Sequence, residues 1–341
     1  MLLRDDAPIS LFPYIYSIPT APLHHSASPP PHASYKISPK SSPKPARRIS
    51  NRNLIILWCA PRSVSTAFER AFISHPTTHA LHEPFSIPYH FGPNPDRLCP
   101  RFEQKCNASF WDIYKEVKSL TESAPANQLK NLKSMQTVPS DDSNINNIFI
   151  KELAYCVTER CGGTKTGTGS LNPTEMTKLL RPITHNTFII RNPNQQILSL
   201  YRQMRRAHPT WELTAQNLWE ESGVGQLFQL FLFVRQQNET TVVVDADDLR
   251  EDPERVIRRY CEEVGVEFSE GMLEWEEGMP EQWKVWGDRG WHDVAVKSTG
   301  IGKVEKKQEE EEEVPGYVRE VVERCMPIYR QMWESRIRVS L

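Results

Sequence analysis

The chain has 341 residues, 25% of them charged, and its 41 Lys and Arg residues against 43 Asp and Glu residues give a formal net charge of −2. This balance provides no global positive field, so we expect neither nucleic acid nor an anionic membrane surface as a partner. No apolar run approaches the ~18 residues of a membrane-spanning helix, and seven cysteines without a Cys-x-x-Cys pair argue against a disulfide framework or a zinc finger. These features favour a cytoplasmic protein.

The first 50 residues differ in composition from the rest of the chain. Residues 1–50 are rich in Pro, Ser and His, which cannot bury enough apolar surface to offset chain entropy. We predict that this segment is disordered and that residues 51–341 form one α/β domain. Two later stretches are expected to be surface loops, namely about 121–147, which is polar and contains prolines, and the charge run at 306–313.

An apolar run at residues 54–57 is followed by a polar turn and then by a helical pattern. A strand, a loop and a helix in this order direct unpaired backbone N–H groups and the positive end of the helix dipole at one point, where an anion can bind. The turn lacks the glycine pair and the lysine of the ATPase loop, so ATP or GTP hydrolysis is disfavoured. The alternative is a serine-capped helix beside an exposed arginine. The donor side chains of the turn are those of Arg62, Ser63, Ser65 and Thr66.

Further strands and helices alternate along the chain. Short β-branched or apolar runs recur at residues 148–150, 187–190 and 241–244. Helical periodicity is clear at residues 194–206, 253–264 and 318–332. This alternation predicts a parallel sheet covered by helices. Because loops at the carboxyl ends of parallel strands meet at one crevice, the residues just after each strand are the site candidates.

A second group of phosphate-binding type follows the strand that ends at residue 190. Arg191 stands at the strand tip, and Ser199 lies about two turns into the next helix. The guanidinium offers a planar fork of donors that matches phosphate oxygens, and the hydroxyl completes the shell. The alternative is a surface arginine beside a helix start. Two anion sites at separate strand ends would indicate a bisphosphorylated ligand.

Short motifs along the chain agree in order and spacing with one enzyme family. They are Arg62-Ser63-x-Ser65-Thr66, His82-Glu83-Pro84-Phe85, Phe149-Ile150-Lys151-Glu152, Arg191-x-Pro193 with Ser199, Asp247-Asp248-Leu249-x-x-Asp252-Pro253, Lys297-Ser298-Thr299-Gly300-Ile301-Gly302 and Cys325-Met326-Pro327-Ile328-Tyr329. The chain from about residue 53 to 334 resembles the sulfotransferases that use 3′-phosphoadenosine 5′-phosphosulfate. It is most similar to microbial and fungal proteins with a Pro-Arg-Ser-x-Ser-Thr loop. The resemblance implies a three-layer α/β fold of the P-loop NTPase type, with a central parallel sheet flanked by helices.

Roles for individual residues follow from the resemblance by matching position. The 5′-phosphosulfate would be held by Arg62, Ser63, Val64, Ser65 and Thr66. The 3′-phosphate would be held by Arg191 and Ser199. The family's glycine-containing loop, which closes over the nucleotide, is matched by Lys297, Ser298, Thr299 and Gly300. We interpret Asp248 and Asp252 as caps of the helix that begins near Pro253, because aspartate at a helix start accepts from orphan N–H groups.

Sulfuryl transfer needs a base for the acceptor's proton and a cation beside the oxygens between phosphorus and sulfur. Glu83 is our first candidate for the base and His82 the second. The alternative for Glu83 is a carboxylate that pairs with Arg62 and orders the loop. The cation is Arg62 or Lys151, at two different strand tips, and the role of Glu152 stays open.

No metal is required for this chemistry. His75, His79 and His82 have a spacing that suits a metal on a helix, but Pro76 breaks that helix. Four tryptophans could line an acceptor pocket or belong to the core. They are Trp275, Trp283, Trp286 and Trp291.

Our leading hypothesis is a sulfotransferase that moves a sulfuryl group to a hydroxyl or amine of a small organic acceptor and releases adenosine 3′,5′-bisphosphate. One alternative keeps the fold but uses it for elimination, cyclisation or other chemistry in specialised metabolism. Another is a non-catalytic nucleotide-binding protein.

Overall fold

The structure is a computed structural model that describes residues 52–92, 107–121, 144–158, 173–181, 183–237, 241–286, 290–302 and 314–339. All of these belong to one compact unit, residues 49–341. The predictions for residues 1–50, for most of 121–147 and for 306–313 lie outside the described residues.

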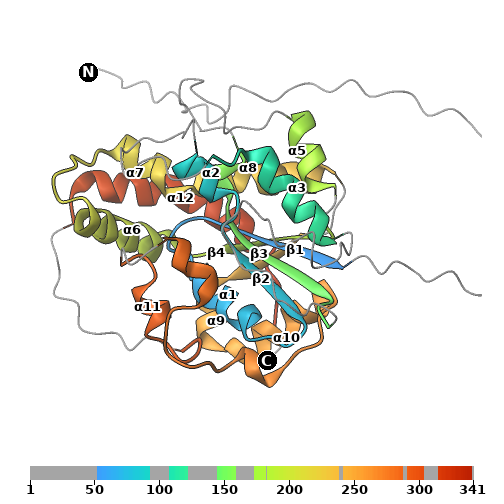
Figure 1. Ribbon diagram of the computed structural model, residues 1–341. Coiled ribbons are helices and arrows are strands. Elements are labelled where there is room, and N and C mark those ends of the chain that lie inside the picture. Colours follow the sequence, from blue (N-terminus) through green and yellow to red (C-terminus); the bar gives the residue numbers. More distant parts are fainter. Residues whose placement is uncertain are drawn as a thin grey trace, which may run out of the picture. The chain divides into compact units, whose positions relative to one another are not determined.

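Within the described residues, five strands form one sheet with the order β2-β3-β1-β4-β5, and every strand pair is parallel (Figure 1). The strands are β1 (Asn53–Cys59), β2 (Thr78–His82), β3 (Asn147–Leu153), β4 (His185–Ile190) and β5 (Val242–Asp245). The parallel sheet predicted from the alternating pattern is therefore confirmed. β1 lies at its centre, between β3 and β4.

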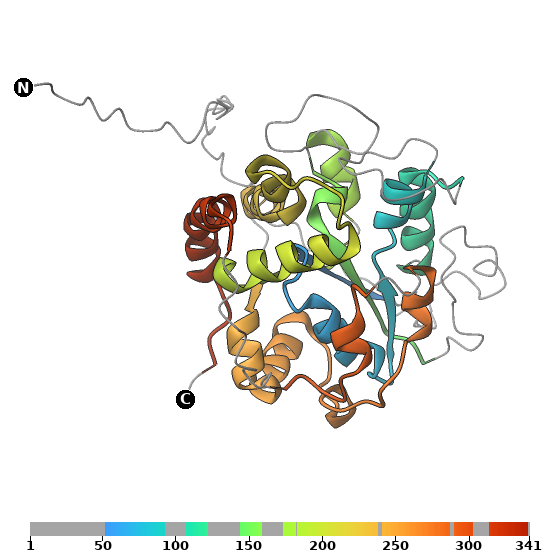
Figure 2. The same cartoon turned by 90° about the vertical axis from the view of Figure 1, so that its left-hand side faces the viewer.

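Helices cover both faces of the sheet, which gives the three-layer α/β fold that was expected (Figures 1 and 2). One face carries α1 (Ser65–Ile73), α9 (Ala246–Glu251) and α10 (Pro253–Val264). The other carries α3 (Phe110–Thr121), α5 (Pro173–Leu180), α6 (Pro193–Ala207), α7 (Ala215–Ser222), α8 (Val224–Gln236) and α12 (Gly316–Trp333). Shorter elements are α2 (Ser86–Phe91), α11 (Asp293–Val296) and the 3₁₀ turns η1 (Ala154–Cys156), η2 (Glu270–Met272) and η3 (Glu281–Trp286).

None of the described helices is long and apolar enough to cross a membrane.

Side chains of β1 alternate between the two hydrophobic cores. Leu54, Ile56 and Trp58 belong to the cluster that includes α8 and α12. Ile55 and Leu57 belong to the cluster that includes α1 and α10. Because β1 is buried on both faces, its sequence is a continuous apolar run instead of an alternating one.

The position of β1 also locates the crevice. The chain passes from β1 to the edge strand β2, returns to β3 and then crosses β1 to reach β4 and β5. The connections that precede β3 and that follow β4 therefore lie on opposite sides of β1. In open parallel sheets the carboxyl ends at such a switch point form the usual ligand crevice. The turn after β1, which contains Arg62, lies at this point.

Polar caps define the helices that follow the last two strands. Asn192 caps α6, and Asp252 caps α10 by accepting from the Arg255 N–H at 3.2 Å. The prediction for Asp252 is confirmed, but the prediction that Asp248 is a cap is wrong. Asp248 forms an ion pair of 2.8 Å with Arg336, because the chain after α12 returns to the edge of the sheet beside β5. The cap of α9 is Asp245, the last residue of β5.

His79 is a buried titratable residue in the edge strand β2. Burial, together with the positive charge of Arg52, lowers the pKa of His79 from 6.5 to about 4. Between these two values the unfolded chain binds a proton that the folded chain does not. Neutral His79 therefore makes its full contribution to the free energy of unfolding above pH 6.5, and this contribution is lost as the pH falls toward 4.

We predict that His79→Gln reduces the acid sensitivity of the fold. Relative to the variant, the wild-type protein should lose roughly 3 kcal/mol of unfolding free energy between pH 7 and pH 4, which is the shift in pKa converted to energy. Urea unfolding at a series of pH values measures this difference. Parallel pH curves for the two proteins would contradict the assignment.

Candidate active site

A cavity of about 2070 Å³ opens at the carboxyl ends of the strands. Its lining includes residues 61–67 after β1, Glu83 after β2, Lys151 in β3, Arg191 after β4 and residues 297–302. The two groups predicted to bind phosphate thus face one shared space. So do both proposed cations and the first candidate for the base.

The turn between β1 and α1 has an uncommon backbone conformation. Arg62 and Val64 have φ angles of 66° and 69°, and Glu83, across the crevice, has 48°. These are all of the positive-φ residues other than glycine in the described part of the chain. Such conformations are costly for residues with a Cβ and cluster at functional sites. Next to them the hydroxyl of Ser63 is buried and finds no partner among the described residues.

Arg62, Arg191 and Ser199 form a connected group. Arg62 Nε donates to Ser199 Oγ at 3.0 Å, and Arg62 Nη1 donates to the Trp291 carbonyl at 2.8 Å. Arg191 Nη1 donates to the Arg62 carbonyl at 2.9 Å. The sequence placed Arg62 in one phosphate group and Arg191 with Ser199 in another. The structure brings the two groups into direct contact.

Both guanidinium groups lie in an environment that disfavours their charge. Burial, together with the charges of Arg250 and Arg62, lowers the pKa of Arg191 to about 10, although Asp247 opposes the shift. Burial also lowers the pKa of Arg62, with a further contribution from Arg206. Arg191 Nε is buried without a partner among the described residues. A bound anion would relieve the repulsion and supply the missing acceptor.

The base candidate Glu83 forms a buried ion pair with Lys151. The Glu83 N–H also donates to the Lys151 carbonyl at 2.8 Å, so backbone and side chain join the ends of β2 and β3. Burial opposes the charged ammonium, but the neighbouring carboxylate of Glu83 outweighs it and raises the pKa of Lys151. The alternative in which Glu83 pairs with Arg62 is therefore wrong, because its ion-pair partner is Lys151.

Glu152, whose role was open, is a positioning residue. Its carboxyl group is fully buried and accepts from the Phe85 N–H at 2.6 Å, the Ser86 hydroxyl at 2.5 Å and the Leu153 N–H at 2.8 Å. Burial raises the pKa of Glu152 to about 8, although these donors favour the carboxylate. These bonds fix the turn from Glu83 into α2.

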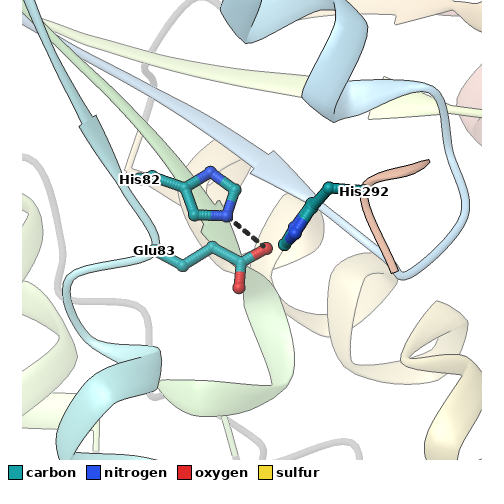
Figure 3. A group of neighbouring side chains, drawn as sticks. All are labelled: His82, Glu83 and His292. Carbon is teal, nitrogen blue, oxygen red and sulfur yellow. Dashed lines mark ion pairs between the residues drawn. The ribbon is translucent and has the colours of Figure 1, made fainter. Parts of the chain in front are cut away.

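His82 lies behind Glu83 and is fully buried. Its Nδ1 lies 2.6 Å from Oε2 of Glu69 in α1, and the ring of His292 packs edge to face against its own at 4.9 Å (Figure 3). Burial raises the pKa of Glu69 to about 8 and lowers that of His82 to about 3. His75, the first of the three histidines whose spacing is not expected to form a metal site, bonds to the Glu267 carbonyl at 2.8 Å.

Arg70 in α1 holds the segment that carries His292. Its buried guanidinium donates to the Gly278, Glu276 and Ala295 carbonyls and lies over the rings of Trp275 and Trp283. The four tryptophans named in the sequence analysis divide between the core and the cavity wall. Trp283 is fully buried in the core. The tryptophans that line the cavity are Trp275, Trp286 and Trp291.

The segment of residues 297–302 lies along the same cavity, as its assignment to the nucleotide requires. Trp275 holds it in place, because its backbone N–H donates to the Thr299 carbonyl at 3.1 Å and its indole Nε1 donates to the Ser298 carbonyl at 2.9 Å. At Gly300 a Cβ atom would lie 2.8 Å from the Leu273 carbonyl oxygen, so only glycine fits. The side chains of Lys297 and Thr299 are exposed at the rim of the cavity.

Three site residues were not found from the sequence, namely Glu69, His292 and the Trp291 carbonyl. Glu69 sits within an amphipathic helix, where a carboxylate is usually solvated. His292 reaches β2 from a segment some 200 residues away, and no local pattern indicates such a contact. The tryptophans around His292 were the only available signal.

A family model described as a sulfotransferase domain matches residues 213–336. The matched residues make up about a third of the chain. The matched part contains β5, α10, α12 and the segment 297–302, and it lies after the turn at residues 61–66.

Two curated proteins of Arabidopsis thaliana are similar to part of the chain. Branched-chain-amino-acid aminotransferase-like proteins 2 and 1 are 29% and 30% identical to it over 144 residues, which is 41% of this chain and 22% and 23% of theirs. The chain therefore spans less than a quarter of the length of these relatives.

Solved structures with a similar course include the sulfotransferase domain from the curacin biosynthetic pathway, with a TM-score of 0.47 and 15% identity over 80% of this chain and 97% of that one. A sulfotransferase from Alicyclobacillus acidocaldarius has a TM-score of 0.40 and 15% identity over 72% of this chain and 93% of its own. Both TM-scores are below 0.5.

We predict that Arg70→Lys destabilises the fold by about 2 to 4 kcal/mol, because the compact ammonium lacks the planar fork of donors that reaches these separate carbonyl groups and stacks on the tryptophan rings. Urea unfolding measures the change. The exposed Arg259 in α10 provides the control, since Arg259→Lys should change the stability by less than about 0.5 kcal/mol. Equal stability of the two variants would contradict the role given to Arg70.

Proposed function

We propose that this sulfotransferase domain moves the sulfuryl group of 3′-phosphoadenosine 5′-phosphosulfate to a hydroxyl or amine of a small organic acceptor. The observation that carries the proposal is the convergence of Arg62, Arg191 and the start of α1 on one cavity. These groups provide guanidinium forks and orphan N–H donors, which bind phosphate and sulfate oxygens. The four cysteines of the described residues are buried and free, which is consistent with a reducing compartment such as the cytoplasm.

The donor nucleotide would lie across the end of β1. Its phosphosulfate would take the N–H groups of residues 63–66 and the buried Ser63 hydroxyl, and its 3′-phosphate would take Arg191 and Ser199. Two buried donors without a partner among the described residues support this fit, namely Ser63 Oγ and Arg191 Nε. The segment from Lys297 to Gly300 would close over the nucleotide.

The donor supplies a sulfur atom bonded to a good leaving group, and the residues of the chain supply the base and the cation. In the proposed step the acceptor oxygen or nitrogen forms a bond to sulfur, the bond between sulfur and the bridging oxygen breaks, and that oxygen leaves on adenosine 3′,5′-bisphosphate. The acceptor's proton passes to Glu83. Protonation of Glu83 weakens its ion pair with Lys151. The ammonium of Lys151 then becomes available to the leaving oxygen as negative charge develops on that oxygen.

Glu83 suits the role of base better than His82, the second candidate. Glu83 lines the cavity, whereas His82 is fully buried behind it and is bonded to Glu69. Burial also lowers the pKa of His82 to about 3, which makes its imidazole a weak base.

The acceptor would enter beside this base. Tyr155, His90 and Trp286 line the cavity, and the rings of His90 and Trp286 lie 5.8 Å apart. Aromatic walls of this kind favour a flat, largely apolar acceptor with one polar group directed at Glu83.

Binding of adenosine 3′,5′-bisphosphate tests the nucleotide site. We expect Arg191→Ala to weaken this binding about 10- to 100-fold in isothermal titration, because the variant loses charge-assisted hydrogen bonds to phosphate. Arg259→Ala, an exposed arginine on α10, should leave the affinity unchanged. The proposal fails if the wild-type protein does not bind the bisphosphate or if both variants bind it equally well.

A second measurement tests the base. With radiolabelled donor and a panel of phenols, alcohols and amines, Glu83→Gln should lower the rate of sulfuryl transfer about 10²- to 10⁴-fold while the bisphosphate still binds. Glu262→Gln, on the exposed face of α10, is the matched control. Undiminished transfer by Glu83→Gln would refute the assignment. Nucleotide binding without transfer to any acceptor would instead favour a repurposed scaffold.

A further inference from the structure

Three possible metal ligands meet at the inner end of the cavity. The ligand atoms of His82, Glu83 and His292 all lie within 4.8 Å of one another (Figure 3). His82 Nε2 lies 3.9 Å from Glu83 Oε1. This distance is slightly longer than the separation between two ligand atoms of one tetrahedral zinc ion. The ligands come from the end of β2 and from the residue before α11, so packing of two distant segments brings them together.

The ring of His82 is oriented by a carboxyl group on its far side. Glu69 Oε2 lies 2.6 Å from His82 Nδ1, and both side chains are fully buried. This contact turns Nε2 toward Glu83 (Figure 3). Histidines that bind metals are held in the same way, because a carboxylate on the second ring nitrogen fixes the ring and makes the ligating nitrogen more basic.

A carboxyl group and an ammonium lie beside the cluster. Glu69 contacts His82, and among the described residues Lys151 is the ammonium paired with Glu83. Lys151 contacts Oε1 of Glu83, and the second carboxylate oxygen can still serve as a ligand.

We propose that His82, Glu83 and His292 form a zinc site, with Glu69 as the residue that positions His82. Two imidazoles and one carboxylate are a donor set typical of Zn²⁺, and a fourth position would face the cavity, which Glu83 and His292 line. Zn²⁺ bound there occupies the carboxylate of Glu83. It therefore inhibits sulfuryl transfer, a consequence that rests on the proposed function, whereas the binding site does not.

Titration of the full-length, metal-free protein with Co²⁺ tests the site directly. Co²⁺ in a site of four or five ligands gives visible absorption bands that aqueous Co²⁺ lacks at the same strength, and added Zn²⁺ should abolish them. His292→Gln should weaken binding at least about 100-fold, and Glu69→Gln about 10- to 100-fold. His185→Gln, a partly exposed histidine at the start of β4, is the matched control and should bind like the wild type.

Circular dichroism and thermal melts establish that each variant is folded. The proposal is overturned if the wild-type protein gives no such bands, or if folded His292→Gln gives the same bands with the same affinity. Binding of adenosine 3′,5′-bisphosphate is measured on the same samples. Loss of nucleotide binding with intact Co²⁺ bands would refute the proposed function alone, and the reverse result would refute the zinc site alone.

Discussion

The buried ion pair between Glu83 and Lys151 is the interaction on which the inner half of the site depends. Removing two charges from water is costly, so such a pair rarely contributes much net stability. Its main effect is on the neighbouring groups. The ammonium holds Glu83 at the cavity, while the carboxyl groups of Glu69 and Glu152, which burial shifts to a pKa of about 8, remain largely protonated at neutral pH. Glu83 therefore faces the cavity paired with Lys151, beside two buried acids that are largely neutral.

The turn after β1 shows how a phosphate-type loop can form without glycine. A glycine pair would adopt positive φ angles at no steric cost. Here Arg62 and Val64 adopt them, and contacts from distant elements hold the conformation in place. Arg191 binds the Arg62 carbonyl, while the Arg62 side chain is held by Ser199 and by the Trp291 carbonyl. The strain is thus offset by hydrogen bonds from the residue after β4, from α6 and from the segment before α11.

The sequence predicted the strands and helices of this molecule better than the contacts between segments that lie far apart in the chain. Runs of β-branched residues and the Asp252-Pro253 pair are local signals, so the strands and α10 could be found in advance. Arg62 and Arg191 could be found because strand ends are site positions in any parallel sheet. Glu69 and His292 could not, since their importance arises only when α1 and the segment before α11 pack against β2. Asp248 was misread because its partner, Arg336, is 88 residues away.

The two halves of the cavity differ in chemistry, and this difference gives the proposed reaction a direction. The guanidinium groups lie at the ends of β1 and β4, whereas the carboxylate and ammonium lie at the ends of β2 and β3. A donor held by both phosphate groups would span β1 with its sulfur toward β3. The acceptor would then approach from the side of Trp286 and His90, opposite the leaving oxygen, as in-line displacement requires. A divalent ion on Glu83 would stand between the acceptor and its base, so the geometry that favours transfer also exposes it to inhibition by metal.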